Sequence, residues 1–228
     1  MSFLETNYVG KCFREGSAAE VWALRDVSLA ISKASFTVLT GPSGSGKTTL
    51  LALLGALDRP SRGQVLLEGR NLTRFSDVEL ARVRRRMGFV FQNFALIPML
   101  PIWENITYPL IPRAIPRAER YRLAQSLLSD CGMADKILKR PDELSAGEQQ
   151  RVAVARAVAG QPEVLLADEP TSNLDRSTGR SLILLLQGFR ASGKTVIVAS
   201  HDAEVVSLAD EVYELELGRL KSRVVSNP

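Results

Sequence analysis

Hydrophobic and polar residues follow two different periods along the chain, and together they predict a protein of alternating strands and helices. Short apolar or alternating runs predict strands at residues 27–31, 36–40, 64–67, 88–91, 163–167 and 195–199. Apolar residues at helical spacing predict helices at residues 47–57, 118–128, 146–159 and 177–191. Because apolar strands that alternate with helices form parallel sheets covered on both faces, the pattern predicts an α/β fold.

The segment of residues 93–141 differs in composition from the rest of the chain. Prolines interrupt it at Pro98, Pro101, Pro109, Pro112 and Pro116. A helical stretch follows these prolines, which predicts an inserted helical subdomain. We therefore predict a single domain over residues 1–228, in which residues 93–159 form a helical subdomain between residues 1–92 and 160–228.

Composition narrows the choice of partner and compartment. Lys and Arg number 29 against 25 Asp and Glu, which gives a net charge of +4. This mild excess comes without a groove-reading motif, so we expect no nucleic-acid partner. Two distant cysteines, Cys12 and Cys131, favour a reducing compartment. Signal-peptide features and apolar runs of about 18 residues are both missing, so we expect a cytoplasmic protein.

Polar residues follow four of the predicted strands at the point where each strand ends. The strands at 36–40, 88–91, 163–167 and 195–199 run, in that order, into Gly41, Gln92, Asp168 with Glu169, and Ser200 with His201. The carboxyl ends of parallel strands share one edge of a sheet, and ligands of α/β folds bind at that edge. The sequence therefore predicts one site that four distant segments build.

The first of these segments has the pattern of a phosphate-binding loop. Residues 41–48 fit G-x-x-x-x-G-K-[ST] between a predicted strand and a predicted helix. Backbone N–H groups and the helix N-terminus would bind phosphate, Lys47 would reach the β and γ phosphates, and Thr48 would hold Mg²⁺. The predicted nucleotide-binding residues here are Gly41, Pro42, Ser43, Gly44, Ser45, Gly46, Lys47, Thr48 and Thr49. A Gly/Ser-rich surface loop is the structural alternative.

The other three segments supply candidate catalytic groups. Asp168 ends an apolar strand, where an unpaired carboxylate is costly, so a magnesium ion is its expected partner. Glu169 is placed to polarise an attacking water. Gln92 would contact both metal and water, and His201, the only histidine, would bond the γ-phosphate. Each of these residues alone has a structural explanation, but their position at one edge favours catalysis.

A further segment, residues 144–151 (Leu-Ser-Ala-Gly-Glu-Gln-Gln-Arg), precedes an Ala/Val-rich helix. Ser145 and Glu148 have the S-x-x-E spacing of a helix-capping box. A serine-capped N-terminus with Gly147 in its first turn also suits phosphate binding. The residues alone leave both interpretations open.

The order of these motifs resembles that of the ABC family of ATPases over essentially the whole chain. Phosphate loop, glutamine, Leu-Ser-x-Gly, Asp-Glu, Ser172-Asn173-Leu174-Asp175 and histidine follow one another as in that family. The resemblance implies a P-loop NTPase with a RecA-like parallel-sheet core, an N-terminal antiparallel β subdomain and an inserted α-helical subdomain. It also implies ATP and Mg²⁺ as ligands. Implied catalytic residues are Glu169, His201, Gln92 and Lys47, and implied metal ligands are Thr48, Gln92 and Asp168.

The same resemblance implies that two subunits face each other head to tail. Ser145 and Gly147 of one subunit would then complete the ATP site of the other, and Asp175 would lie at the interface. Phe13 matches the aromatic residue that stacks on adenine, with Trp22 as the alternative. The chain departs from the family at Ala146, where glycine is usual, and a helical first turn accepts alanine.

Residues 41–51, 88–98 and 167–175 are similar to the subfamily that serves macrolide exporters, lipoprotein-release systems and a related cell-division complex. This implies a homodimer or a paired ATPase subunit, attached to the cytoplasmic face of the inner membrane through a separate integral-membrane permease. Residues 95–111, with Trp103 and Tyr108, either receive a permease helix or pack in the core. The alternative function is a regulatory ATPase that activates a membrane partner without transport.

Overall fold

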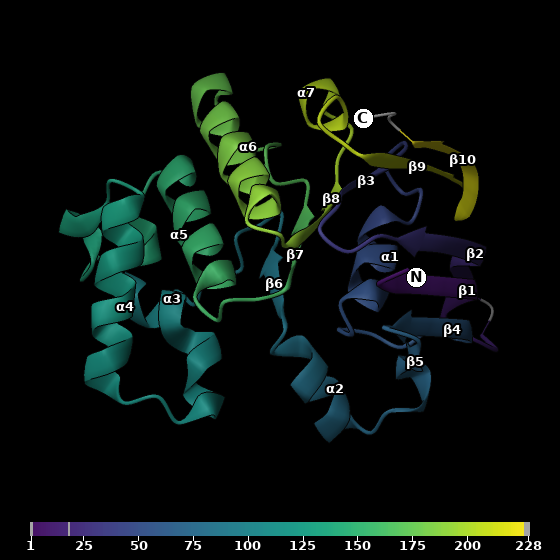
Figure 1. Ribbon diagram of the computed structural model, residues 1–228, viewed down its shortest axis with the longest axis horizontal. Coiled ribbons are helices and arrows are strands. Elements are labelled where there is room, and N and C mark those ends of the chain that lie inside the picture. Colours follow the sequence, from purple (N-terminus) through teal and green to yellow (C-terminus); the bar gives the residue numbers. More distant parts are fainter. Residues whose placement is uncertain (1, 18, 226–228) are drawn as a thin grey trace. The chain divides into compact units, whose positions relative to one another are not determined.

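The computed structural model describes residues 2–17 and 19–225, which form two compact units (Figure 1). The first unit comprises Met1–Arg84 and Leu186–Pro228, and the second comprises Arg85–Leu185. Within the described residues, none of the helices has both the length and the apolar character that crossing a bilayer requires.

An antiparallel sheet forms the N-terminal part of the first unit. Its strands lie in the order β2 (Val21–Ile31), β1 (Leu4–Phe13), β4 (Arg62–Leu67) and β5 (Arg70–Asn71) (Figure 1). Leu4 of the central strand pairs with Ile31 on one side and with Leu67 on the other, and all three side chains are buried. The predicted strand at residues 27–31 is thus the end of a longer strand, in an antiparallel subdomain of the expected kind.

The other strands of the first unit form a mixed arrangement, with three parallel strands and one antiparallel strand. β3 (Phe36–Thr40) lies parallel to both β8 (Thr195–Ala199) and β9 (Glu211–Glu216). β10 (Arg219–Val225) pairs antiparallel with β9. Every residue of β8 is buried, which explains its continuous apolar sequence.

The helices of the first unit include the one that follows the phosphate loop. Helix α1 (Lys47–Leu54) buries Leu50, Leu51, Leu53 and Leu54. The apolar spacing predicted that it extends to residue 57, but it ends at Leu54 because Gly55 caps it and donates its N–H to Leu51. The unit also contains the short helices η1 (Leu72–Arg74), α2 (Asp77–Arg84) and α7 (Ala203–Val206).

The second unit combines two parallel strands with a group of helices. β6 (Met87–Val90) pairs in parallel with β7 (Val164–Asp168). The helices are α3 (Ile102–Thr107), η2 (Tyr108–Arg113), α4 (Arg117–Asp130), η3 (Ala134–Lys136), η4 (Pro141–Glu143) and α5 (Ala146–Val158). Helix α6 (Arg176–Ala191) runs past residue 185, where this unit ends. Figure 1 shows α3, α4 and α5 lying side by side, with a shared apolar core.

The proline-rich segment of residues 95–111 contributes to that core and to the surface. Trp103 is buried among the helices, 4% exposed, and stacks edge-on against Tyr121 with 5.4 Å between ring centroids. Met99 and Tyr108 instead are 73% and 49% exposed. Core packing therefore accounts for Trp103, while Met99 and Tyr108 remain available to a partner.

Candidate functional site

The phosphate loop connects β3 to α1 in the first unit, as its position in the sequence predicted. Gly46 is the N-cap of α1, in the left-handed conformation with φ 103°, and as a glycine it has no side chain that could cap the helix. The first turn of α1 also contains no acidic residue. The helix N-terminus therefore keeps donor groups and a partial positive charge directed at the loop, as an anion-binding turn requires.

Two of the loop glycines are required by close backbone approaches. A Cβ atom at Gly41 would lie 2.1 Å from the carbonyl oxygen of Leu215, and one at Gly46 would lie 2.6 Å from that of Ala23. At Gly44, where φ is +77°, a Cβ would meet nothing within 4 Å. Gly41 and Gly46 thus fix the loop against the sheet, while the open side at Gly44 lets a ligand approach the backbone.

The polar side chains of the loop differ in their surroundings. The Ser45 hydroxyl is buried without a hydrogen-bond partner among the described residues. The Lys47 side chain is mostly buried, and Nζ donates to the carbonyls of Gly41 at 2.8 Å and Pro42 at 3.2 Å. The remaining predicted positions are partly or fully exposed: Pro42, Ser43, Thr48 and Thr49. The loop thus presents a cation, hydroxyls and amides together, a donor set that suits a polyphosphate.

His201 lies at the same sheet edge as the loop within the first unit. β3 and β8 run in parallel with Leu39 opposite Ala199, so the residues that follow both strands are neighbours. The Ser200 N–H donates to the Leu39 carbonyl at 3.0 Å, and His201 comes next and is exposed. The structure therefore brings Lys47 and His201 to one edge.

Gln92, Asp168 and Glu169 come together in the same way within the second unit. β6 and β7 run in parallel with Val90 opposite Ala167, and the three residues follow at the ends of these strands. Asp168 is 7% exposed. Glu169 is half-buried and has φ 43°, an unusual backbone conformation for a non-glycine residue.

Asn173 was not among the predicted site residues, but it fixes the backbone of Gln92. Its Nδ2 donates to the Gln92 carbonyl at 3.2 Å. The carbonyl of Glu169 accepts from both the N–H and the hydroxyl of Ser172, at 3.2 and 2.9 Å. The Ser172–Asp175 segment thereby holds the loop after β6 and the loop after β7 close to each other.

Ser145 caps helix α5, as the sequence spacing predicted. Its hydroxyl accepts from the Glu148 N–H at 3.3 Å, and the Glu148 carboxylate accepts from the Ser145 N–H at 2.8 Å. The Ser145 backbone N–H and then its hydroxyl stabilise the carboxylate, which holds the pKa of Glu148 below its usual range. Ser145 and Ala146 are exposed, and Ala146 occupies the first helical position. An exposed capped N-terminus remains compatible with the second role, phosphate binding across a dimer.

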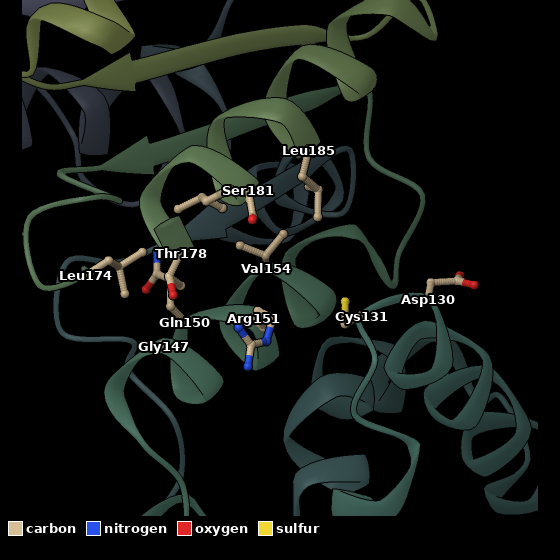
Figure 2. A pocket seen from close by; sticks show the side chains of 11 residues that line it. Asp130, Cys131, Gly147, Gln150, Arg151, Val154, Leu174, Thr178, Ser181 and Leu185 are labelled. Carbon is tan, nitrogen blue, oxygen red and sulfur yellow. The ribbon is translucent and has the colours of Figure 1, made fainter. Parts of the chain in front are cut away.

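Gly147 has a packing role that the sequence did not reveal. A Cβ atom there would lie 3.1 Å from Cγ2 of Thr178 on α6. Figure 2 shows both residues at the wall of a pocket of about 290 Å³ between α5 and α6. Glycine thus lets the first turn of α5 approach α6 closely.

The two candidates for adenine stacking, Phe13 and Trp22, lie far from these loops in the sequence. Phe13 ends β1 with 44% of its surface exposed, and Lys11 Nζ lies 5.3 Å from its ring centroid. The alternative, Trp22, has its indole N–H bonded to Glu20 and its ring covered by Arg62 at 4.8 Å. Phe13 therefore offers the more accessible ring for stacking.

Asp175 is bonded within its own chain at the start of α6. Its carboxylate accepts hydrogen bonds from both the backbone and the hydroxyl groups of Ser177 and Thr178. The hydroxyl bonds from Ser177 and Thr178, with their backbone N–H groups, hold the pKa of Asp175 well below its usual range. Capping of α6 is thus one established role of Asp175, and its predicted place at a dimer interface stays a prediction.

Comparison with known proteins adds independent information. A family model described as "ABC transporter" matches residues 24–172. An uncharacterized ABC transporter ATP-binding protein of Thermotoga maritima is 45% identical over 89% of this chain and 87% of its own length. The macrolide export ATP-binding/permease protein MacB of Nitrosomonas europaea is 40% identical over 98% of this chain, which spans 34% of that relative.

Solved structures include close matches to the whole fold. The ATP-binding cassette MJ0796, in a dimeric post-hydrolysis state bound to ADP and Pi, is 37% identical with a TM-score of 0.91. That match covers 97% of this chain and 98% of the other. A second dimeric structure of the same cassette, described as a bacterial ABC transporter cassette, gives the same values.

Proposed function

The chain belongs to the ABC transporter family, and we propose that it closes as a dimer around MgATP and drives a separate integral-membrane permease. The chain is an ATPase. The observation that carries the proposal is the phosphate loop, in which Gly41 and Gly46 meet backbone oxygens and α1 begins without a capping side chain. A loop of this kind binds the phosphates of a nucleotide.

Lys47, Thr48 and the loop amides bind the phosphates in this proposal, and Phe13 stacks on the adenine. Among the described residues, no group of three or more His, Cys, Asp or Glu could hold a metal by itself. Mg²⁺ is usually bound through one or two carboxylates together with substrate phosphates, so a set of Thr48, Gln92 and Asp168 fits it. Bound there, the ion would neutralise charge that develops on the phosphates.

Hydrolysis requires a group that accepts a proton from the attacking water. Glu169 takes this role, with its carboxylate at the end of β7 and its backbone held by Ser172. His201 orients the water and the γ-phosphate from the other strand end, and Gln92 senses the nucleotide. Ser145 and Gly147 complete the site of the opposing subunit, so a single chain is inactive.

A complementation experiment tests whether the site is shared between two copies of this chain. Lys47→Ala disables the phosphate loop and Ser145→Arg blocks the exposed start of α5, so each variant alone should lack ATPase activity. When the two variants are mixed, one site of each mixed dimer combines an intact loop with an intact Ser145. We expect the mixture to recover a clearly measurable part of wild-type phosphate release.

Two controls define the outcome. The double variant carrying both substitutions, mixed with itself, should stay inactive because no intact site can form. A mixture of the single variants that stays inactive, while wild-type protein hydrolyses ATP, would contradict the pairing of identical chains. Recovery at protein concentrations where light scattering detects no dimer would likewise contradict a shared site.

The exposed part of the 95–111 segment is the proposed permease contact, through which the protein attaches to the cytoplasmic face of the membrane. We expect Met99→Glu with Tyr108→Glu to abolish permease stimulation of ATPase activity, because charge cannot enter an apolar groove without a large desolvation cost. The measurement compares the chain with and without the permease that co-purifies with it from membranes.

The control for this experiment is Leu217→Glu, which changes an 86% exposed leucine in the first unit. It should leave both basal and stimulated activity unchanged. Stimulation of the Met99/Tyr108 variant to the wild-type level would show that this surface is not the contact.

A further inference from the structure

Helix α5 makes two polar contacts with distant loops, one through the half-buried Arg156 and one through the buried Gln150. The first involves Arg156, near the end of the helix. Its guanidinium donates to the carbonyl of Phe94 at 2.6 Å and also to that of Ala95. Burial lowers the pKa of Arg156 to about 10, so the group is still charged at neutral pH and lies where a cation is costly.

The backbone that Arg156 holds is in an unusual conformation. Phe94 has φ 56° and Ala95 has φ 49°, in the left-handed region that non-glycine residues seldom adopt. These two residues follow Gln92 and Asn93 directly. The charged guanidinium of Arg156 donates to two successive carbonyls and so stabilises this conformation. It thereby fixes the direction of the backbone after Gln92.

The second contact involves Gln150, in the first half of the helix. Gln150 is 2% exposed, and its Nε2 donates to the carbonyl of Pro170 at 2.9 Å. Pro170 follows Glu169, whose φ of 43° is also left-handed. A single buried amide thus holds the turn that presents the Glu169 carboxylate.

The two contacts leave the helix on different sides. Gln150 and Arg156 are six positions apart, which at 3.6 residues per turn separates their side chains by about 120° around the axis. One rigid helix can therefore contact the loop after Gln92 and the loop after Glu169 at the same time. Its N-terminus is Ser145, the residue proposed to meet the nucleotide of the opposing subunit.

We propose that Arg156 and Gln150 are positioning residues, through which helix α5 sets the geometry of Gln92 and Glu169 in its own chain. This inference rests on the proposed function, because it assigns the two residues to ATP hydrolysis. When Ser145 engages the opposing nucleotide, the resulting shift of α5 moves both catalytic loops. Hydrolysis in one site is thereby coupled to closure at the other.

The test compares Arg156→Met and Gln150→Met with Arg113→Met. Arg113 is a matched control, because it also donates to two backbone carbonyls in the second unit, of Gly160 at 3.0 Å and Arg85 at 2.6 Å, but contacts no catalytic loop. We expect the first two variants to lower kcat by about tenfold or more, since small misplacements of catalytic groups have effects of this size. Affinity for MgATP should stay within about threefold, because the phosphate loop is unchanged.

A double-mutant cycle gives a readout that a purely structural role would not change. In a Gln92→Ala background, Arg156→Met should cause little further loss of kcat, because the residue through which it acts is already gone. Arg156→Lys, which keeps the charge but not the fork, should recover part of the loss. Independent, multiplicative losses of kcat would overturn the proposal for Arg156.

The inference and the proposed function fail in different ways. If wild-type protein is active but Arg156→Met and Gln150→Met match Arg113→Met in kcat at equal Tm, the inference alone is overturned. If wild-type protein hydrolyses no ATP at any concentration, the proposed function fails and the comparison has no basis. A fall in kcat that matches the loss of folded protein in all three variants would also overturn the inference.

Discussion

Replacing Glu169 by Gln should lower ATP turnover by at least about 100-fold while leaving MgATP binding intact. The amide has the shape of the carboxylate but cannot accept the proton of the attacking water. The backbone of residue 169, held by Ser172 and by the Gln150 contact to Pro170, keeps its conformation in the variant. Because ATP binds but is not consumed, we expect a stable ATP-bound dimer, measured by light scattering beside phosphate release.

Glu163→Gln is the matched control at the opposite end of the same strand. Glu163 precedes β7 and pairs with Arg86 at 2.8 Å, with both side chains partly exposed. Removing a partly exposed ion pair costs less than about 1 kcal/mol, so turnover and dimerisation should remain normal. Rapid ATP hydrolysis by Glu169→Gln would rule out Glu169 as the general base, whatever the control shows.

The sequence predicted the fully buried strands well, because burial on both faces leaves continuous apolar runs. It did not predict β1, β9 or β10, in which exposed or half-buried positions interrupt the apolar pattern. β8, in which all residues are buried, coincides with the predicted strand at 195–199. The predicted clustering at strand ends is also present within each unit, for Lys47 with His201 and for Gln92 with Glu169. Parallel pairing puts these ends at the same edge, so a short local pattern predicts a long-range arrangement.

Contacts between distant segments were the part that the sequence could not predict. The capping box of Ser145 and Glu148 is local, and its spacing alone indicated it. Gln150 and Arg156 bond to carbonyls of loops that are far away in the chain, and backbone acceptors carry no sequence signature. Arg156 within an Ala/Val-rich helix was a signal of a polar contact on the packed side of the helix, but not of its partner.

The structural roles of individual glycines also could not be predicted from the sequence. The sequence assigned Gly147 to phosphate binding, and the structure adds a close approach to Thr178 that any Cβ would crowd. The phosphate-loop pattern does not distinguish one glycine from another. In the structure they differ in the atoms that a Cβ at each position would meet. Gly41 lies against the backbone of Leu215 in β9, whereas a Cβ at Gly44 would meet nothing within 4 Å.

Gly41→Ala should lower MgATP affinity by at least about 100-fold. A loss of this size means that the binding free energy weakens by about 2.8 kcal/mol, since each 1.4 kcal/mol corresponds to a factor of ten in binding. The new Cβ would lie 2.1 Å from the carbonyl oxygen of Leu215, at a φ of +139° that alanine adopts only with strain. Leu215 is fully buried in β9, which pairs with β3, so the oxygen cannot withdraw without disturbing the sheet. The loop must move instead, and Lys47, which bonds to the Gly41 carbonyl, moves with it.

The control for this prediction is Gly69→Ala, at a position where φ is +75° and a Cβ would meet nothing within 4 Å. It imposes left-handed strain of about 1 kcal/mol without a clash, so the free energy of unfolding should fall slightly and MgATP affinity should not change. Binding is measured by equilibrium titration after circular dichroism has established that each variant is folded. A folded Gly41→Ala protein with wild-type affinity would show that the loop can bind phosphate without its contact to β9, and the steric account of the motif would be wrong.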